Sequence, residues 1–495
     1  MTNAKDTGFG RRTFLEMATA AGAAPLAPAL LGAGAASAQT APAHHEETNH
    51  ETERLAAYAA KLRYEELPAA VVQRAKDCIC DTVGAIVYGA ELPWSKMIIA
   101  HARRTSAAGR SSILGSEGDG VQAGAAALAN GAMTHAFELD SLTKPDSGSH
   151  PGATVFTAAL AVAQDRGLTG RDLLTAFVAG AESMFRIGHA TKHTNEARGF
   201  HAPGTTGPFG AAVAAGRLMG LDADKMTNAL GVAGSCAGGL LEFAHAGNGA
   251  MVKRLHMGRA AEGGVLAASL AADGFTGPTS VLEGEYGFLR VFCNDWDVAE
   301  LTRGLGTEYF TLDIMLKRYA CHITAHNPVE ATLELRKEHK FTAADVNAIT
   351  IAGNERMAKT NNIPAPADMM LAQYSIPFSV ALSLYRDPID PRSFDEQVVH
   401  DRAILDLASR TKMAVTPGQD RRNLVATVTI KLKDGREVSR QVTSFKGMPE
   451  RPMTLPELRE KFLLLTQRLG RDKMVSLFDR LQAIEEEKTL DWLNV

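Results

Sequence analysis

The sequence GPFGAAVAAG, from Gly207 to Gly216, places glycines among apolar residues at helical spacing. A glycine inside a helix costs about 1 kcal/mol relative to alanine, so its repeated use predicts a helix whose backbone lies close to neighbouring helices. The segment LGVAGSCAGG, from Leu230 to Gly239, has a similar composition. Both segments therefore predict a domain of tightly packed helices.

Apolar residues recur at intervals of three and four from Leu55 onward. Val71, Ala75, Cys78 and Ile86 lie on one face of such a helix. Further helices are predicted at residues 123–137, 153–165, 173–186, 210–219, 225–237 and 260–272. The first half of the chain is therefore predicted to be entirely helical.

The pattern changes near Asp295. VNAITIAG (Val346 to Gly353) is rich in β-branched residues and predicts a strand. LVATVTIKLKDGREVSRQVTSF alternates on both sides of Asp434-Gly435, which predicts a hairpin. A helix is predicted at 376–385, and amphipathic helices return after Pro452. We therefore predict a mainly α fold, in which a large all-helical domain is interrupted by a smaller α+β domain.

The domain boundaries follow from these changes in pattern. A 495-residue chain is too long for one ordinary core. The predicted parts are a signal peptide (1–38), a linker (39–50), the first part of the helical domain (51–294), the α+β domain (295–450) and the C-terminal part of the helical domain (451–495).

The N-terminal segment resembles a twin-arginine export signal. Arg11 and Arg12 precede Phe14 and a weakly hydrophobic, alanine-rich run, and Ala36-Ser37-Ala38 is a small-x-small cleavage site. We expect cleavage after Ala38 and a periplasmic mature protein. No later segment offers eighteen uninterrupted apolar residues, so no membrane association is expected after signal removal.

Composition excludes several function classes. Apolar residues make up 45% and charged residues 22%, with a net charge of −4. Mixed charge of this kind argues against a nucleic-acid partner or a polybasic membrane surface. The five cysteines are Cys78, Cys80, Cys236, Cys293 and Cys321. They are odd in number, irregularly spaced and without a CxxC pair, so the sequence predicts neither a disulfide framework nor a zinc or iron–sulfur site.

The segment MVKRLHMGRAAEGG (Met251 to Gly264) places Lys253 and His256 one helical turn apart. The nearest acidic residue in this segment is Glu262, more than a turn further on. Two cationic groups without an acidic neighbour predict an external anion, which we interpret as the substrate.

His322 and His326 have the i, i+4 spacing of a helical metal pair. The glutamate of an HExxH motif is absent, and Pro328 is expected to break the helix. We therefore predict no metal site.

Eight motifs occur in the order typical of the MmgE/PrpD family, which the chain resembles from about Leu55 to its C-terminus. They are YEELPAAVVQRAKDCICDTVGAIVYGA, ANGAMTHAFELDS, HPGATVFTAALAVAQ, GFHAPGTTGPFGAAVAAGRLMGL, VKRLHMGRAAEGG, FTGPTSVLEGEYGF, KRYACHITAH and AQYSIPF. The family includes 2-methylcitrate dehydratase, cis-aconitate decarboxylase and iminodisuccinate epimerase. The resemblance implies a homodimer of helical-plus-lid subunits that acts on small polycarboxylates without a metal or organic cofactor.

Site residues are carried over from this resemblance. Histidines are expected to exchange protons, acidic residues to orient them, and lysines to hold substrate carboxylates. The expected catalytic residues are His150, His201, His322, Asp140 and Glu138. The expected substrate-binding residues are Lys253, His256, Lys317, Phe378 and Tyr374.

Three departures bear on the reaction. Glu138 stands where relatives commonly have aspartate, and the run before His150 is about two residues longer than in them. Phe378 stands where members often have tyrosine, and Tyr374 is the nearest substitute for the missing hydroxyl.

Dehydration of a di- or tricarboxylate related to 2-methylcitrate or aconitate, by proton abstraction next to a carboxylate, is the default expectation. Epimerisation and decarboxylation are the alternatives in chemistry. A periplasmic carboxylate-binding protein without turnover is the alternative outside the enzymes.

Overall fold

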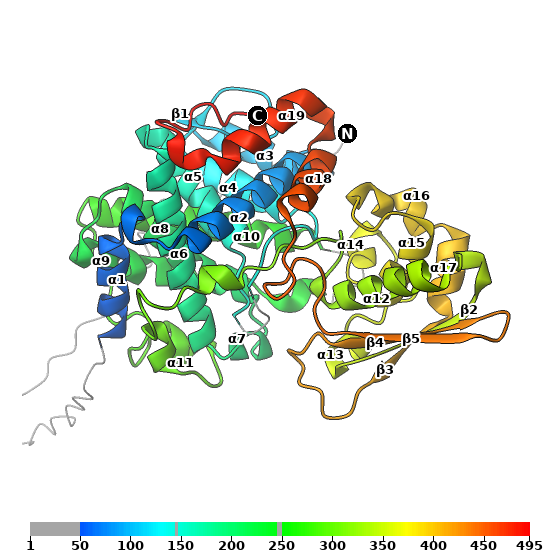
Figure 1. Cartoon of the computed structure of the whole chain (residues 1–495). Helices are drawn as coiled ribbons and strands as arrows, with labels where there is room; N and C mark the ends of the chain where they lie inside the picture. The colour runs from blue at the N-terminus through cyan, green and yellow to red at the C-terminus, as the bar shows by residue number, and fades with distance from the viewer. Residues whose placement is uncertain (1–49, 144–146, 245–249) are drawn as a thin grey trace, which may run out of the picture. The chain divides into compact units, whose positions relative to one another are not determined.

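The computed structural model describes residues 50–143, 147–244 and 250–495, and Figure 1 shows the course of the chain. The predicted export signal and all of the predicted linker except His50 lie outside the described residues. The described part is mainly helical with a small mixed sheet, which confirms the predicted fold class. Among the described helices, none combines the length and the apolarity that a membrane crossing requires.

The first part of the described chain is helical apart from the short strand β1 (Ala108–Ser111). Its helices are α1 (Glu51–Lys61), α2 (Ala69–Gly89), α3 (Pro93–Thr105), α4 (Ala123–Thr134), α5 (Thr157–Arg166), α6 (Gly170–Ala190), α7 (Thr194–Ala197), α8 (Ala202–Leu218), α9 (Ala223–Gly234), α10 (Val252–Ala272) and α11 (Phe288–Phe292). A π-helical turn, Gly152–Phe156, precedes α5.

Close helix packing explains the glycines of α8. A Cβ atom on Gly210 would lie 2.9 Å from the carbonyl oxygen of Gly180 in α6. On the other side, a Cβ atom on Gly264 of α10 would lie 2.3 Å from the Cβ atom of Ala211. Contacts this short do not occur between real Cβ atoms and their neighbours, so only glycine permits α8 to pack between α6 and α10. The predicted close packing is confirmed.

Helix α8 begins at Ala202, earlier than the predicted start at residue 210, and contains Pro208. Proline lacks the N–H that would bond to the carbonyl of residue 204. The Gly204 carbonyl instead accepts a hydrogen bond from the Gly238 N–H, at 3.2 Å. The helix therefore continues through the proline because a neighbouring loop satisfies the freed carbonyl.

The smaller α+β part contains a four-stranded sheet in the order β3-β2-β4-β5. Strand β2 (Val346–Gly353) pairs in parallel with β3 (Thr411–Val415) and antiparallel with β4 (Ala426–Leu432), and β4 forms the predicted hairpin with β5 (Glu437–Val442). Its helices are α12 (Ile323–His339), α13 (Glu355–Lys359), α14 (Met369–Ala372), α15 (Ile376–Tyr385), α16 (Glu396–Val399) and α17 (Arg402–Ser409).

Pro328 does not end its helix. Helix α12 runs through it to His339, contrary to the expectation from sequence. Pro328 is the sixth residue of α12, where a proline removes a single backbone hydrogen bond. The neighbouring Asn327 is buried and donates to the Leu424 carbonyl at 2.7 Å.

The C-terminal helices α18 (Leu455–Leu465) and α19 (Arg471–Gln482) pack on α2. Phe462 and Phe478 join the core of the first helical part, and Lys461 forms a buried ion pair with Asp81 of α2 at 2.5 Å. A second apolar cluster fills the α+β part and also takes Tyr88 and Phe137 from the helical part. All five cysteines, each within the described residues, are free.

Candidate active site

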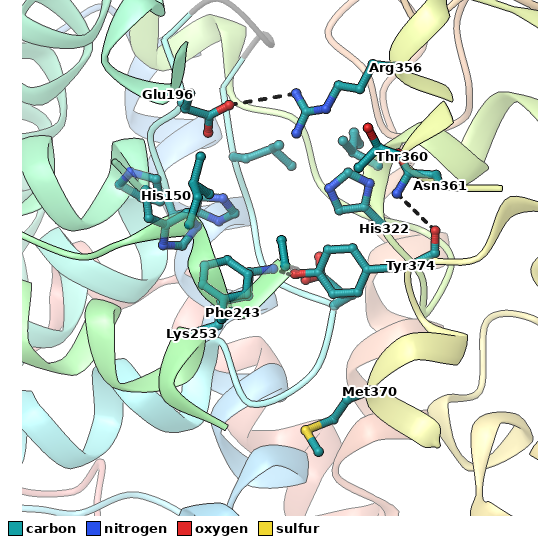
Figure 2. A pocket seen from close by; sticks show the side chains of 18 of the residues that line it. His150, Glu196, Phe243, Lys253, His322, Arg356, Thr360, Asn361, Met370 and Tyr374 are labelled. Atoms are coloured by element: carbon teal, nitrogen blue, oxygen red, sulfur yellow. Dashed lines mark hydrogen bonds and ion pairs between the residues drawn. The ribbon is translucent and has the colours of Figure 1, made fainter. Parts of the chain in front are cut away.

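A cleft is lined by residues from the helical part and from the α+β part, which we call the lid. The first part supplies His150 and Lys253, and the lid supplies His322 and Tyr374 (Figure 2). His201 of the first part also lines the cleft. Seven of the ten residues expected from sequence line this cleft: Glu138, His150, His201, Lys253, Lys317, His322 and Tyr374. Asp140 lies directly behind them, whereas His256 and Phe378 do not line the cleft.

Helix N-termini bring three of these side chains to the cleft. His201 is the N-cap residue of α8, His322 is the N-cap residue of α12, and Lys253 is the second residue of α10. The N-terminus of a helix carries a partial positive charge and unpaired N–H groups. The backbone therefore adds to the positive potential that the lysine supplies.

Glu138 bridges two buried lysines. Its carboxylate forms an ion pair with Lys253 through Oε1 and lies 2.7 Å from Lys317 Nζ through Oε2. Burial opposes the ionisation of Glu138, but the two ammonium groups outweigh it and hold its pKa well below the ordinary value. Burial lowers the pKa of Lys253, whereas for Lys317 the charges of Glu138 and Asp140 outweigh burial and raise the pKa.

The expectation that Lys253 lacks an acidic partner is therefore wrong. Glu138, 115 residues away in sequence, supplies the negative charge. The lysines remain suited to bind a substrate carboxylate, because Glu138 occupies the same kind of position that such a carboxylate would take. The cationic interpretation of His256 is also wrong, since burial and the Lys253 charge lower its pKa to about 4.

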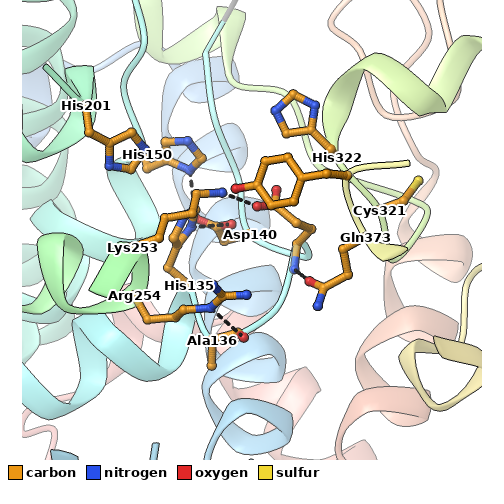
Figure 3. A network of polar contacts seen from close by, with 12 residues as sticks. His135, Ala136, Asp140, His150, His201, Lys253, Arg254, Cys321, His322 and Gln373 are labelled. Atoms are coloured by element: carbon orange, nitrogen blue, oxygen red, sulfur yellow. Dashed lines mark hydrogen bonds and ion pairs between the residues drawn. The ribbon is translucent and has the colours of Figure 1, made fainter. Parts of the chain in front are cut away.

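Asp140 accepts hydrogen bonds from two histidines (Figure 3). The Nδ1 atom of His150 lies 2.7 Å from Asp140 Oδ2, and His135 Nδ1 lies 3.0 Å from both oxygens. Burial opposes the ionisation of Asp140, but His135, His150 and Lys317 hold its pKa well below the ordinary value. The ionised carboxylate keeps the proton of each ring on Nδ1, which leaves His150 Nε2 as the basic nitrogen.

His135 was missed by sequence reasoning. Its position five residues before Asp140, in the same motif as Glu138, was the available signal. Its ring is buried, and burial lowers its pKa to about 3. It acts as a neutral neighbour of Asp140.

On the lid side, the rings of His322 and Tyr374 stack with centroids 5.0 Å apart. His322 Nδ1 lies 2.9 Å from Thr324 Oγ1, and burial lowers the pKa of His322 well below its ordinary value. The Tyr374 ring lies 4.8 Å from Lys253 Nζ. Burial and the Glu138 charge raise the pKa of the Tyr374 hydroxyl, which keeps it protonated as a donor.

Gln373 ties the lid to the Glu138 loop. Its side-chain oxygen accepts from the Glu138 N–H at 3.0 Å, and its backbone carbonyl accepts from the His322 N–H at 2.7 Å. Gln373 is fully buried. One residue therefore sets the position of Glu138 relative to His322, which nothing in the sequence pattern indicated.

The upper wall of the cleft holds a second ionic group that sequence reasoning missed. Arg356, on α13 of the lid, lies 3.8 Å from Glu196 Oε2 on α7, as Figure 2 shows. His193 Nε2 lies 2.7 Å from the same oxygen. Burial opposes ionisation of Glu196, but His193 and Arg356 lower its pKa to about 2. No local motif marks these residues, because only the folded chain brings α7 and α13 together.

Phe378 is fully buried in the lid core, where its ring contacts Phe394 at 6.3 Å between centroids. It lies one turn along the chain from Tyr374, but on α15 it faces away from the cleft. The phenylalanine at position 378 therefore packs in the lid core and does not change the cleft, and Tyr374 is the tyrosine that lines the cleft.

Among the described residues, His135, Asp140 and His150 place ligand-type atoms within 4.8 Å of one another. These atoms already pair as hydrogen-bond donors and acceptors, so a metal ion would have to displace two protons held between the rings and the carboxylate. His322 and His326 do not converge, because His326 Nε2 bonds to the Cys321 carbonyl at 3.1 Å.

The MmgE/PrpD N-terminal domain matches residues 53–301, and the MmgE/PrpD C-terminal domain matches residues 319–482. The chain belongs to the MmgE/PrpD family. The cleft takes residues from both matched segments, since His150, His201 and Lys253 fall in the first and His322, Arg356 and Tyr374 in the second.

Similar MmgE/PrpD proteins with curated names are cis-aconitate decarboxylases. The one from Aspergillus terreus is 30% identical over 444 residues, which cover 84% of this chain and 89% of the relative. The one from Homo sapiens is 27% identical over 450 residues, covering 88% and 92%. The one from Mus musculus is 26% identical over 452 residues, covering 88% and 91%.

Proposed function

We propose that this chain is a lyase that decarboxylates cis-aconitate or a closely related unsaturated tricarboxylate, without a metal or organic cofactor. The observation that carries the proposal is the convergence of Lys253 and Lys317 on one side of a cleft whose other walls present His150, His201 and His322. Anion-binding groups and proton-exchanging groups thus face the same space.

The relatives favour decarboxylation over the dehydration expected from the family resemblance alone. Each of the three relatives compared is named for decarboxylation of cis-aconitate. Dehydration and epimerisation share the same early chemistry, because all three develop negative charge next to a carboxylate. They differ in which group leaves, so a product assay separates them.

Decarboxylation of an unsaturated tricarboxylate requires the protein to stabilise negative charge and to donate a proton. The bond between a methylene carbon and its carboxylate breaks, carbon dioxide leaves, and the electron pair moves through the adjacent double bond to the far carbon. That carbon then takes up one proton. Fixed cations stabilise the developing charge in a site that excludes water, and a positioned histidine supplies the proton.

The lysines, the arginines and the helix N-termini are suited to stabilise the developing negative charge. Lys253 and Lys317 hold one substrate carboxylate in place of, or beside, the Glu138 carboxylate. Arg254 also lines the cleft. Arg356 on the lid forms only a long ion pair with Glu196, at 3.8 Å. Arg356 is placed to hold a second substrate carboxylate, because its planar group binds carboxylates through two donors.

The test is a product assay by nuclear magnetic resonance in D₂O, with cis-aconitate, 2-methylcitrate and iminodisuccinate as separate substrates. Decarboxylation predicts carbon dioxide and a dicarboxylate that carries one solvent deuteron on the newly protonated carbon. Loss of water from 2-methylcitrate would move the assignment to a hydro-lyase, and deuterium exchange without loss of a group would move it to an isomerase.

A matched pair of variants links the activity to the cleft. Lys317→Met should lower kcat/KM on the order of ten- to a thousandfold, since charge-assisted hydrogen bonds contribute roughly 1.5–3 kcal/mol. Lys359→Met removes an exposed lysine of α13 that pairs with Glu355, and should leave turnover unchanged. Thermal stabilisation by these acids without any product or exchange would instead support a binding protein.

A further inference from the structure

His201 contacts a second histidine behind the cleft. Its Nδ1 atom lies 3.1 Å from Nδ1 of His256, with the ring centroids 5.3 Å apart. Two nitrogens at this distance share one proton, so one ring donates and the other accepts. His201 lines the active-site cleft, whereas His256 lines a separate second cavity together with Cys236, Leu240 and Arg259. The histidine pair therefore spans the wall between the two cavities.

The surrounding backbone is shaped to admit this contact. Gly239 has φ of +116°, and a Cβ atom there would lie 3.1 Å from His256 Nδ1. The Gly239 carbonyl accepts from the His201 N–H at 2.9 Å, which fixes the start of α8 against this loop. A Cβ atom on Gly204 would lie 3.4 Å from His256 Cβ and 2.4 Å from the Gly238 carbonyl oxygen. Glycine at 204 and 239 thus lets the two rings meet.

The other cleft histidines have no such outlet in the part of the chain that the structure describes. His150 Nδ1 bonds to the buried Asp140 carboxylate, and His322 Nδ1 bonds to the Thr324 hydroxyl. His193, which also lines the cleft, bonds through Nε2 to Glu196 of the same cleft. Only the Nδ1 atom of His201 leads to another titratable ring that lines a different cavity.

We propose that His256 is a proton-relay residue that supplies His201 from the second cavity, an inference that rests on the proposed decarboxylation. Each turnover consumes one proton, and the relay lets His201 give up its Nε2 proton while the bound substrate still excludes water from the cleft. His256 does not touch the substrate; it acts through His201.

The relay passes a proton through both rings without charging either of them. His256 initially donates its Nδ1 proton to His201 Nδ1, and His201 carries its own proton on Nε2. The His201 Nε2 proton forms the new C–H bond with the substrate electron pair, as the His256 Nδ1 proton passes to His201 Nδ1. In the same concerted step a hydronium ion or buffer acid in the second cavity protonates His256 Nε2, so neither ring becomes an anion. After product leaves, water in the emptied cleft protonates His201 Nε2, the His201 Nδ1 proton returns to His256 Nδ1, and His256 Nε2 releases its proton to the second cavity, which restores the starting tautomers.

The electrostatics fit a neutral relay. Burial lowers the pKa of His201 well below its ordinary value, and burial and Lys253 lower that of His256 to about 4. Both rings are therefore neutral near neutral pH. A neutral imidazole is a very weak acid on its own, and it gives up a proton readily only if its second nitrogen receives one.

Two variants of His256 separate a relay from a structural role. His256→Gln keeps an N–H group that can donate to His201 but has no second nitrogen to pass a proton through, and His256→Ala removes the contact. The relay predicts that both lower kcat on the order of ten- to a hundredfold, with KM changed less than about twofold because His256 does not line the cleft. A purely structural role predicts near-normal kcat for His256→Gln, which would overturn the proposal.

Chemical rescue provides the second readout. Added imidazole should restore part of the kcat of His256→Ala, because it can enter the second cavity and exchange protons at both nitrogens. Pyrrole has the same size and an N–H group but no basic nitrogen, so it should not. Equal rescue by both compounds, or by neither, contradicts the relay. Arg259→Gln, which alters the same cavity without touching His201, is the control and should retain wild-type kcat.

The outcomes also distinguish the two proposals. Wild-type protein that turns over no tricarboxylate contradicts the proposed function. The relay is then judged by nuclear magnetic resonance of wild-type protein labelled with ¹⁵N at histidine, in which a nitrogen–nitrogen coupling across the His201–His256 hydrogen bond is expected. Absence of that coupling would reject the relay. Wild-type turnover with unaffected His256 variants rejects the relay alone.

Discussion

Lys253 is 5% exposed and pairs with Glu138, which in turn contacts Lys317. A lysine without an acidic partner in its own segment thus belongs to a buried network of three charges. Removing one member of a buried ion pair is costly, because the remaining charge stays desolvated. Here Lys317 still compensates Glu138, so the cost is smaller than for an isolated pair.

We therefore expect Lys253→Met to lower both activity and stability. Loss of one charge-assisted hydrogen bond to substrate predicts a fall in kcat/KM on the order of ten- to a thousandfold. The melting temperature should also fall, and adding Glu138→Gln should recover part of it without recovering activity. Steady-state kinetics and thermal melting of the two single variants and the double variant measure both effects. An unchanged melting temperature for Lys253→Met would show that Glu138 is not destabilised by its loss.

Tyr374 and Phe378 lie close in sequence but in different environments. Tyr374→Phe should lower kcat/KM, because it removes a protonated hydroxyl that faces the Glu138 charge beside Lys253. Phe378→Tyr should not raise activity, since its ring lies in the lid core. Burying an added hydroxyl without a partner costs roughly 1–3 kcal/mol, so this variant should melt earlier. Higher turnover in Phe378→Tyr would place residue 378 in the site.

At the scale of elements, the predicted helices were largely correct in place but not at their ends. Helices α8 and α10 begin at Ala202 and Val252, before the predicted starts at 210 and 260. The first turns of both contain polar residues, proline or glycine, which interrupt the apolar periodicity. These first turns carry His201 and Lys253 to the cleft, so the part of each helix hardest to predict is the part that functions.

Helix α12 carries a buried histidine that makes stability depend on pH. His326 is fully buried, its Nδ1 atom has no hydrogen-bond partner among the described residues, and burial lowers its pKa to about 3. In the unfolded chain the pKa is about 6.5. Between these values the unfolded chain binds a proton that the folded chain does not, so acidification favours unfolding.

We expect His326 to account for about 2 kcal/mol of stability lost between about pH 7.5 and about pH 5. His326→Phe keeps the ring contacts with Tyr319 and Phe445. Its loss of unfolding free energy between the two pH values should be about 2 kcal/mol smaller than that of wild type. Urea unfolding at the two pH values measures the difference, with exposed His101 changed to Phe as the control. An identical pH dependence in wild type and His326→Phe would contradict the assignment.

At the scale of the whole molecule, export remains a prediction from sequence. The double substitution of Arg11→Lys with Arg12→Lys should retain the precursor in the cytoplasm, because the arginine pair of such signals is read by a receptor. Cell fractionation with an antibody against the mature protein measures it. Undiminished periplasmic accumulation of the double variant would refute the signal. The homodimer implied by the family resemblance likewise stays a prediction.

The sequence by itself determined the fold class, the sheet hairpin around Asp434-Gly435 and the close packing of the glycine-rich helices. These depend on local periodicity, turn chemistry and side-chain size, all of which are written in short segments. It also indicated the residue types of the site, because the ordered motifs contain His150, His201, Lys253 and His322.

Only the tertiary structure decided how those residues are paired. Glu138 meets Lys253 and Lys317, Asp140 meets His135 and His150, and His201 meets His256 across long separations in sequence. Phe378 packs in the lid core, whereas Tyr374 lines the cleft. Charge compensation and the pKa of a buried group depend on which atoms lie within a few ångströms of it, and such neighbours are set by packing between distant elements rather than by the pattern within any one of them.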